Sequence, residues 1–408
     1  MNMKPNMQVE YCGVNFKNPL IVASATPTKN AEYMRKCCEA GAGGLISKTI
    51  SPEPLAQQYS NPRFTILHKS GWPNIYSNYS AEFLCTYNTE EWWPQMVEAK
   101  KVCDEYNTTL VGSISGVSIP NWQELAKKME DIGVPMIELN FGCPHPKDLG
   151  YKSGQVLGNS PDAAAEVVNA VVNAVKIPVF TKLTGEAVNI VESAGKVKAA
   201  GASGVTVINR YSSLDIDIKT GRPILHSAYA GVGGPWMRPI MLKWVAKIAK
   251  EHNIPISATN GIYTWEDFAK AMMVGATTVQ VCTAIIYGGK KFGVIKDILD
   301  GFENYLIENN ISAAKDIIGK TLPQIVTWDK VNRDIRPCSS VDPEKCNGCG
   351  LCPNWCFKDA ITMTGEGEDA KAVIDSNKCE GCGLCPSLCP EDAVSIKADT
   401  PIFLGDFN

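Results

Sequence analysis

The sequence predicts an α/β fold, a (β/α)8 TIM barrel, followed by a small α+β domain. The first observation behind this prediction is a series of eight short apolar segments, separated by amphipathic stretches, over roughly 300 residues. The second is a glycine that recurs between a helical stretch and the apolar segment after it. The third is a group of eight cysteines within about forty-five residues near the C-terminus, spaced like metal ligands.

Eight candidate strands follow from this pattern. A helical stretch ends in glycine, and a β-branched run starts a few residues later, at Gly41, Gly133, Gly201 and Gly275. Glycine readily adopts the left-handed conformation just past a helix, so each site predicts an α-to-β turn. With four further apolar runs, the expected strands are Pro19–Ala25, Gly44–Thr49, Leu110–Ser115, Met136–Asn140, Pro178–Leu183, Gly204–Asn209, Ile256–Thr259 and Thr278–Cys282.

The expected strands are apolar on nearly every residue, which is typical of parallel strands that are buried on both faces. The stretches between them place apolar residues at helical spacing, for example Trp122, Leu125 and Met129. Eight βα units in roughly 300 residues favour a closed barrel over an open doubly wound sheet, although periodicity by itself permits both.

The composition argues against nucleic-acid and membrane partners. The 408 residues carry a formal net charge of −4, and there is no polybasic run. The N-terminal residues Met1–Glu10 are polar, and no segment approaches the ~20 apolar residues that a membrane span requires. Cysteines clustered at metal-ligand spacing indicate a reducing compartment. We therefore expect a cytoplasmic protein that acts on small molecules and contacts other proteins.

The pattern divides the chain into three parts. We expect the barrel over residues 1–310, a connector over 311–337 and a second domain over 338–408. The second domain contains two copies of one phrase, Val341–Cys346 and Ile374–Cys379, about thirty-three residues apart. This repeat predicts two similar halves.

Each half carries the cysteine spacing C-x2-C-x2-C-x3-C, which predicts a two-cluster ferredoxin-like domain. In that arrangement the fourth cysteine of each run crosses to the other cluster. A pair of structural zinc sites is the rival interpretation, but zinc usually takes two separated C-x2-C pairs. One 4Fe-4S cluster is thus predicted on Cys346, Cys349, Cys352 and Cys389, and the other on Cys379, Cys382, Cys385 and Cys356.

The segment Glu138–His145, at the end of the expected fourth strand, resembles the N-x-x-C-P motif of the dihydroorotate dehydrogenase family. His145 resembles the dihydropyrimidine dehydrogenase branch more closely. With the cysteine-rich domain included, nearly the whole chain is similar to the catalytic subunits of bacterial NAD-dependent dihydropyrimidine dehydrogenases. Further similar segments are Ala23–Ala25, Lys48–Thr49, Lys182–Thr184, Asn209, Gly231–Pro239 and Gln280–Cys282.

This resemblance implies that FMN binds at the carboxyl ends of the barrel strands. Lys48 and Lys182 would stabilise negative charge on the reduced flavin; lysines that snorkel to the barrel mouth are the alternative. Backbone N–H groups after the last two strands would hold the phosphate, whereas Gly234 belongs either to this cradle or to a plain turn. The implied cofactor-binding residues are Ala23, Ser24, Lys48, Thr49, Asn140, Lys182, Asn209, Gly234, Asn260, Gly261 and Thr283.

Catalysis is expected at Cys143, with His145 beside it. The resemblance implies that hydride passes between flavin N5 and one carbon of a ring C=C bond, while the thiol gives a proton to the adjacent carbon or removes one in reverse. A buried structural cysteine is the alternative. The segment Pro144–Val156 is expected to act as a lid. The expected substrate-binding residues are Asn78, from a loop after the second strand, Asn140, Asn209 and Arg210.

Arg210 departs from the family pattern, which has a small hydroxyl residue after the asparagine. A guanidinium there suits a carboxylate on the substrate through two parallel hydrogen bonds. Alternatively, Arg210 pairs with a surface carboxylate such as Asp215. The first interpretation indicates an acidic ring compound in place of plain uracil.

The sequence contains no strand followed by G-x-G-x-x-G, the fingerprint of a dinucleotide site. We therefore expect electrons to come from a separate FAD- and NAD-binding subunit or from a ferredoxin, and the protein to be an oligomer. The leading hypothesis is an oxidoreductase of the CH–CH group that converts uracil or thymine to the 5,6-dihydro form. The alternatives are a dihydroorotate dehydrogenase or reductase of a carboxylated heterocycle, and an electron-transfer subunit without its own substrate.

Overall fold

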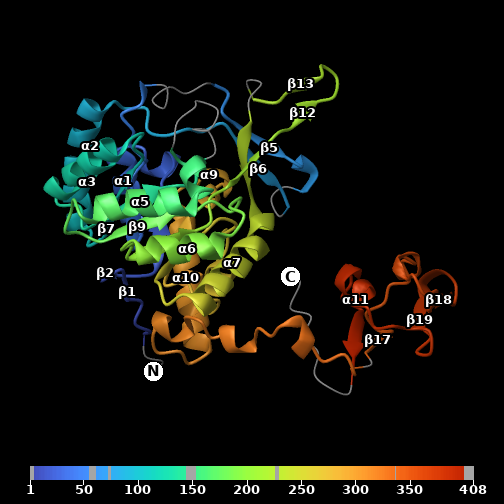
Figure 1. Cartoon of the computed structure of the whole chain (residues 1–408). Helices are drawn as coiled ribbons and strands as arrows, with labels where there is room; N and C mark the ends of the chain where they lie inside the picture. The colour runs from blue at the N-terminus through green and yellow to red at the C-terminus, as the bar shows by residue number, and fades with distance from the viewer. Residues whose placement is uncertain are drawn as a thin grey trace. The chain divides into compact units, whose positions relative to one another are not determined.

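The computed structural model describes residues 4–54, 61–71, 75–143, 153–225, 229–335 and 337–398. The chain forms two compact units, Met1–Gln324 and Ile325–Asn408 (Figure 1). The division falls inside the segment 311–337 that the sequence marks as a connector. Within the described residues, no helix combines the length and the apolar character needed to cross a bilayer.

The first unit is a closed barrel of eight parallel strands that follow one another in chain order. The last strand pairs with the first, in the register Val279↔Leu20, and this pairing closes the sheet. The barrel prediction is confirmed, and the open doubly wound sheet is excluded. The barrel strands are β3 (Leu20–Val22), β4 (Gly44–Ile46), β7 (Thr109–Ile114), β8 (Met136–Asn140), β9 (Val179–Lys182), β10 (Gly204–Val207), β15 (Ile256–Thr259) and β16 (Thr278–Val281).

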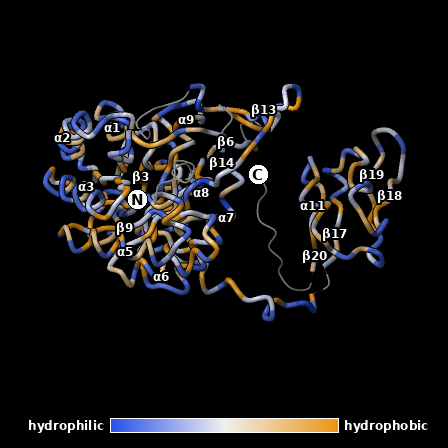
Figure 2. The backbone as a smooth tube through the Cα atoms, turned by 45° about the horizontal axis from the view of Figure 1, so that its top comes forward, coloured by the Kyte–Doolittle hydropathy of each residue, from blue (hydrophilic) through white to orange (hydrophobic). Residues whose placement is uncertain are grey.

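Helices cover the outside of the barrel, and the longer ones pack an apolar stripe onto it. In Figure 2 the tube is mostly hydrophobic along the barrel strands and alternates along the helices. The four glycines that predict α-to-β turns all have positive φ, from +85° at Gly133 to +113° at Gly275, as the left-handed position past a helix requires. The helices are α1 (Ala31–Glu39), α2 (Thr89–Glu105), α3 (Ile119–Asp131), α4 (Gln155–Gly158), α5 (Pro161–Val172), α6 (Ile190–Ala199), α7 (Arg238–Glu251), α8 (Trp265–Met273), α9 (Thr283–Tyr287) and α10 (Gly293–Glu308).

Two hairpins and a small sheet are added to the barrel. The hairpin of β1 (Val9–Tyr11) and β2 (Val14–Phe16) covers the amino-terminal end of the strands, where the Tyr11 hydroxyl donates to the Val205 carbonyl. An antiparallel sheet has the order β11-β14-β6-β5, and a short hairpin joins β12 to β13. These strands are β5 (Phe64–Leu67), β6 (Ser77–Ser80), β11 (Tyr211–Ser213), β12 (Ile216–Asp217), β13 (Arg222–Pro223) and β14 (Ala230–Gly233).

This antiparallel sheet corrects the expectation that Asn78 lies in a loop. Asn78 lies in β6 and pairs with Gly233 of β14, so the segments after the second and sixth barrel strands meet in one sheet. The residues Ser77–Ser80 do not alternate between apolar and polar side chains, as a strand with one buried face would. All four side chains are buried, although most of them are polar. The pairing joins positions far apart in the chain, which local periodicity cannot show.

The second unit is built from two antiparallel strand pairs. β17 (Cys338–Val341) pairs with β20 (Val394–Lys397), and β18 (Ile361–Thr364) pairs with β19 (Lys371–Ile374). Together with the short helix α11 (Leu384–Leu388), this is the α+β arrangement that the sequence predicts. The small core consists of Cys352, Ile361, Ala372, Cys385 and Val394.

Single 3-10 turns complete the described structure of both units. They are η1 (Thr26–Thr28), η3 (Lys69–Gly71), η5 (Pro235–Met237), η6 (Ala314–Ile317), η7 (Leu322–Gln324), η8 (Trp328–Lys330), η9 (Cys352–Trp355) and η10 (Gly367–Asp369).

Candidate active site and cluster module

A cavity enclosing about 930 Å³ of space, its open mouth included, lies at the carboxyl ends of the barrel strands. Most of the site residues expected from the sequence line it. Gly234 does not: a β-carbon added there would collide with the Tyr76 carbonyl oxygen, and the neighbouring Gly233 lines the cavity instead. His145 lies outside the described residues, as do residues 144–152 of the expected lid. The expected residues that line the cavity are Ala23, Ser24, Lys48, Thr49, Asn78, Asn140, Cys143, Lys182, Asn209, Arg210, Asn260, Gly261 and Thr283.

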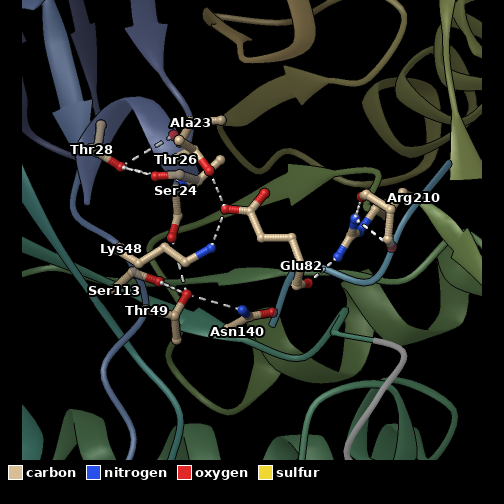
Figure 3. Close-up of polar contacts among 12 residues, drawn as sticks. Ala23, Ser24, Thr26, Thr28, Lys48, Thr49, Glu82, Ser113, Asn140 and Arg210 are labelled. Atoms are coloured by element: carbon tan, nitrogen blue, oxygen red, sulfur yellow. Dashed lines mark hydrogen bonds and ion pairs between the residues drawn. The ribbon is translucent and has the colours of Figure 1, made fainter. Parts of the chain in front are cut away.

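A buried ion pair joins Lys48 to Glu82, a residue that sequence reasoning missed. The Lys48 ammonium lies 2.7 Å from Oε1 of Glu82, and the Thr26 hydroxyl donates to the same oxygen at 2.6 Å (Figure 3). Burial by itself would raise the pKa of Glu82, but Lys48, Thr26 and Arg210 outweigh it and hold the pKa below its usual value. Glu82 is therefore an ionised carboxylate in the cavity wall.

Arg210 is held on the other side of Glu82 (Figure 3). One terminal nitrogen donates to the carbonyl and hydroxyl of Ser80, and the other donates to the Glu82 carbonyl at 2.5 Å. The pairing with Asp215 considered from the sequence is wrong, because the described partners of Arg210 are neutral oxygens of the strand β6 and the residues after it. The guanidinium also lies on Gly231, where an added β-carbon would stand 2.4 Å from Nε.

Thr49 links the polar side chains of the first and fourth strand ends. Its hydroxyl lies 3.0 Å from the Ser24 hydroxyl and 2.8 Å from that of Ser113. The Asn140 amide donates to it at 3.0 Å, and Asn140 Oδ1 accepts from the Gly142 backbone. These bonds fix the orientation of the Asn140 amide in the cavity.

Two further amides at the cavity are also oriented by hydrogen bonds. The Asn209 amide donates to the Gly142 carbonyl, next to Cys143. Oδ1 of Asn78 accepts from the Tyr287 hydroxyl at 2.6 Å. The Asn78 Nδ2 group is thereby kept as a donor, since its carbonyl oxygen is engaged.

A buried carboxyl group lies in the barrel interior. Oε2 of Glu138 accepts from the Thr206 hydroxyl at 2.8 Å, while Oε1 has no partner among the described residues. Burial raises the pKa of Glu138, and Lys182, Thr206 and Gln280 offset only part of that effect. The carboxyl group of Glu138 is thus a weaker acid than an ordinary glutamate, in contrast to that of Glu82.

Two cysteines line the cavity, at the ends of the fourth and eighth strands. Cys143 is buried, and it packs against Leu84 and Phe83. Cys282 precedes α9, and burial with the nearby Glu82 carboxylate raises the pKa of its thiol to about 12. Cys282 therefore remains a thiol near neutral pH.

The segments after the last two strands provide a candidate anion cradle. Asn260 and Gly261 both have positive φ, and a β-carbon on Gly261 would collide with the Arg238 backbone. Nδ2 of Asn260 is buried without a hydrogen-bond partner among the described residues. The Tyr263 hydroxyl is 2.5 Å from that of Thr283. An unsatisfied buried donor beside these turns fits a phosphate oxygen.

The second unit contains two pockets, each ringed by four cysteines. Their surrounding space is about 350 Å³ and 560 Å³. Backbone N–H groups point at the sulfurs: Ala360 donates to Cys356 and Ala393 to Cys389, both at 3.3 Å. One pocket contains Cys346, Cys349, Cys352 and Cys389, and the other Cys356, Cys379, Cys382 and Cys385, which are the two ligand sets expected from the sequence.

Comparison with known proteins assigns the barrel to a family. The sequence profile described as "Dihydroorotate dehydrogenase" matches residues 6–306, well over half of the chain. The chain belongs to the dihydroorotate dehydrogenase family. The profile described as "4Fe-4S dicluster domain" matches residues 345–393. FMN and two 4Fe-4S clusters are the cofactors of this dihydroorotate dehydrogenase family member.

Relatives within the dihydroorotate dehydrogenase family have two different names. The catalytic subunit of dihydroorotate dehydrogenase B (NAD(+)) from Pyrococcus abyssi (strain GE5 / Orsay) is 33% identical over 321 residues, which cover 78% of this chain and 99% of the relative. The NAD-dependent dihydropyrimidine dehydrogenase subunit PreA of Escherichia coli (strain K12) is 29% identical over 366 residues, which cover 86% and 85%. Both relatives are named as subunits, and the chain is an oxidoreductase like them.

A solved structure agrees with the fold. The crystal structure of DHODH in complex with ferulenol from Eimeria tenella has a TM-score of 0.64 and 20% identity, covering 77% of this chain and 88% of the other. The similarity in fold extends over the barrel and adds nothing about the substrate.

Glu82 could have been suspected from one signal in the sequence. It interrupts the otherwise apolar run Ala81–Cys85, and a carboxylate in such a run must find a partner once it is buried. That partner, Lys48, lies 34 positions earlier in the chain, and a local sequence pattern cannot identify it.

Proposed function

We propose that this family member reduces, or in reverse oxidises, a ring C=C bond of a pyrimidine-like cyclic amide. The observation that carries the proposal is the convergence of Cys143 with three side-chain amides in one cavity. The amides belong to Asn78, Asn140 and Asn209, and each has a fixed orientation. Side-chain amides both donate and accept hydrogen bonds, so they match the C=O and N–H groups of a cyclic amide.

FMN, when bound, supplies a hydride equivalent to one ring carbon. Lys48, Lys182, Ser24, Thr49 and Asn140 would bind the flavin ring, and the segments at Asn260–Gly261 and Thr283 would hold the phosphate. The buried unsatisfied donor of Asn260 supports this arrangement.

Cys143 would hold and move the proton at the adjacent ring carbon. As general acid, its thiol gives a proton to that carbon; in the oxidative direction, its thiolate removes one. The side chain is buried against Leu84, which keeps water away from the sulfur. Cys282 is a poor substitute, because its raised pKa disfavours the thiolate.

Electrons would reach the barrel through the two clusters, from a separate FAD- and NAD-binding subunit or from a ferredoxin. The subunit names of both relatives support a multi-subunit enzyme. We also propose that the assembly is an oligomer in the cytoplasm.

A carboxylated ring such as orotate is the second candidate substrate, and Arg210 favours it. A guanidinium has five N–H groups, and three hydrogen bonds are made to Ser80 and Glu82. The remaining N–H groups suit a substrate carboxylate. The 33% identity to a dihydroorotate dehydrogenase B subunit also supports this candidate.

Anaerobic re-oxidation of the photoreduced holoenzyme distinguishes these substrates. If a neutral ring is the substrate, uracil and thymine are expected to re-oxidise the flavin rapidly. If a carboxylated ring is the substrate, orotate is expected to do so. Arg210→Ala is expected to abolish the response to orotate and to leave that to uracil largely intact. If neither pyrimidines nor orotate nor hydroxypyridine carboxylates re-oxidise the flavin, the proposal is wrong and an electron-transfer subunit without its own substrate becomes the better description.

A further inference from the structure

The charged side chains of the cavity are not equivalent. Among the described residues that line it, the cations are Lys48, Lys182 and Arg210, and the only carboxylate is Glu82. Lys48 is in direct contact with that carboxylate at 2.7 Å. Lys182 forms no ion pair within the described part of the chain; the nearby Glu138 contacts Thr206 and Gln280 instead.

The Glu82 side chain is buried in the wall of the cavity and held there by several contacts. Both side chains of the ion pair are at most 7% exposed. The carboxylate is held by Lys48 and Thr26, and the backbone carbonyl of the same residue is held by Arg210. Three contacts from three different segments fix its position, so a flavin entering the cavity meets a preformed neutral pair at Lys48.

From this we infer that Glu82 is a positioning residue that neutralises Lys48 and thereby keeps the reduction potential of the bound FMN low. Reduction adds negative charge to the flavin, and charged groups close to the ring tune its electronics. An uncompensated Lys48 would favour the reduced form, whereas the Lys48–Glu82 pair contributes no net charge. A low potential makes the reduced flavin a stronger reductant and biases the site toward reduction of its substrate.

This inference rests on FMN occupying the cavity and not on the identity of the substrate. It is therefore tested by measuring the reduction potential of the bound FMN, which requires no substrate turnover. The midpoint potential of the flavin is measured in the anaerobic holoenzyme by spectroelectrochemical titration, with the clusters followed separately by electron paramagnetic resonance. A protein that carries no FMN would contradict the proposed function; a protein that carries FMN with an unaltered potential in the variants would contradict only this inference.

Two single variants and their combination give opposite expectations. Glu82→Gln is expected to raise the potential by at least about 29.6 mV, which is a tenfold change in a two-electron equilibrium. Lys48→Met is expected to lower it by a similar amount, because Glu82 then stands without its partner. The double variant restores zero net charge, and its potential is expected to return to within about half that shift of the wild-type value.

Structural damage would produce a different pattern. A damaged site would move the double variant further from the wild type than either single variant, and that result would overturn the inference, as would an unchanged or lowered potential in Glu82→Gln. Glu138→Gln is the matched control, since it changes another buried carboxyl group to an amide; an equal shift there would also overturn the inference. If Glu82→Gln does not retain FMN, the double variant must still have a higher potential than Lys48→Met.

Discussion

The Tyr287 hydroxyl donates a 2.6 Å hydrogen bond to Oδ1 of Asn78, across 209 positions of the chain. The bond connects α9, which follows the last barrel strand, to β6 of the antiparallel sheet. It leaves the Asn78 Nδ2 group as the donor available to a ligand. Two insertions that are remote in sequence therefore cooperate to orient one amide.

Tyr287→Phe tests whether this orientation matters for substrate binding. Loss of a neutral hydrogen bond costs about 0.5–1.5 kcal/mol, so KM is expected to rise by roughly two- to thirteenfold while kcat changes less. Steady-state kinetics with the substrate found by flavin re-oxidation give both parameters. Tyr305→Phe, on the outer helix α10, should leave both unchanged; an equal effect there would show that the tyrosine change acts through general stability.

Cys143→Ser and Cys282→Ser separate the two cavity thiols. Cys143→Ser is expected to slow substrate-dependent flavin re-oxidation by about 10²–10⁴-fold, the usual range for loss of a general acid. Cys282→Ser is expected to stay within about threefold of the wild type, because burial raises the pKa of its thiol to about 12 and it does not ionise in the working range. Stopped-flow measurements under anaerobic conditions provide the rates. A stronger effect at Cys282 would reverse the assignment of the acid.

Gly231→Ala tests the placement of Arg210 without removing its charge. The new β-carbon would stand 2.4 Å from Nε of Arg210, and the flexible guanidinium must move away. We expect weaker binding of acidic ring compounds by about tenfold or more, with a thermal midpoint close to that of the wild type. Isothermal titration with orotate and melting curves measure the two effects. Gly293→Ala, where the nearest atom is 3.7 Å from the added carbon, is the control and should bind like the wild type.

Glu138→Gln should change the pH dependence of stability. Burial raises the folded-state pKa of Glu138 above its unfolded value of about 4.3. The folded state therefore binds more protons than the unfolded state between these two pKa values, and this carboxyl group makes the protein less stable as the pH rises through that window. The variant lacks the ionisation, so its thermal midpoint relative to that of the wild type is expected to increase as the pH is raised above about 4.3. A difference that decreases as the pH rises would mean that the folded-state pKa of Glu138 lies below its unfolded value.

Pairs of cysteine variants test the crossed ligand sets. Cys349→Ser with Cys389→Ser changes two residues of one pocket, and the protein is expected to retain about half of its roughly eight iron atoms. Cys349→Ser with Cys356→Ser changes two residues of the same run but of different pockets, and both clusters are expected to be lost. Iron analysis of anaerobically purified protein measures the result. The opposite outcome would show that each run holds its own cluster.

The sequence by itself determined the barrel and most of the residues that line the cavity, and it predicted the two cysteine ligand sets. Strands such as Met136–Asn140 and turns such as that at Gly133 are local features, because apolar periodicity and a left-handed glycine depend on residues close in the chain. The family motif likewise placed Lys48, Asn140 and Lys182 at strand ends. The closure of the barrel then brings these three residues together in one cavity.

Only the tertiary structure decided which charges meet. Three features join segments that are at least 34 positions apart in the chain: the Lys48–Glu82 pair, the anchoring of Arg210 on Ser80 and the position of Asn78 in a strand. Their energies depend on burial and distance in space, which no local pattern contains. The reason is physical: a carboxylate in an apolar run must find a partner, but its partner is set by the closure of the barrel.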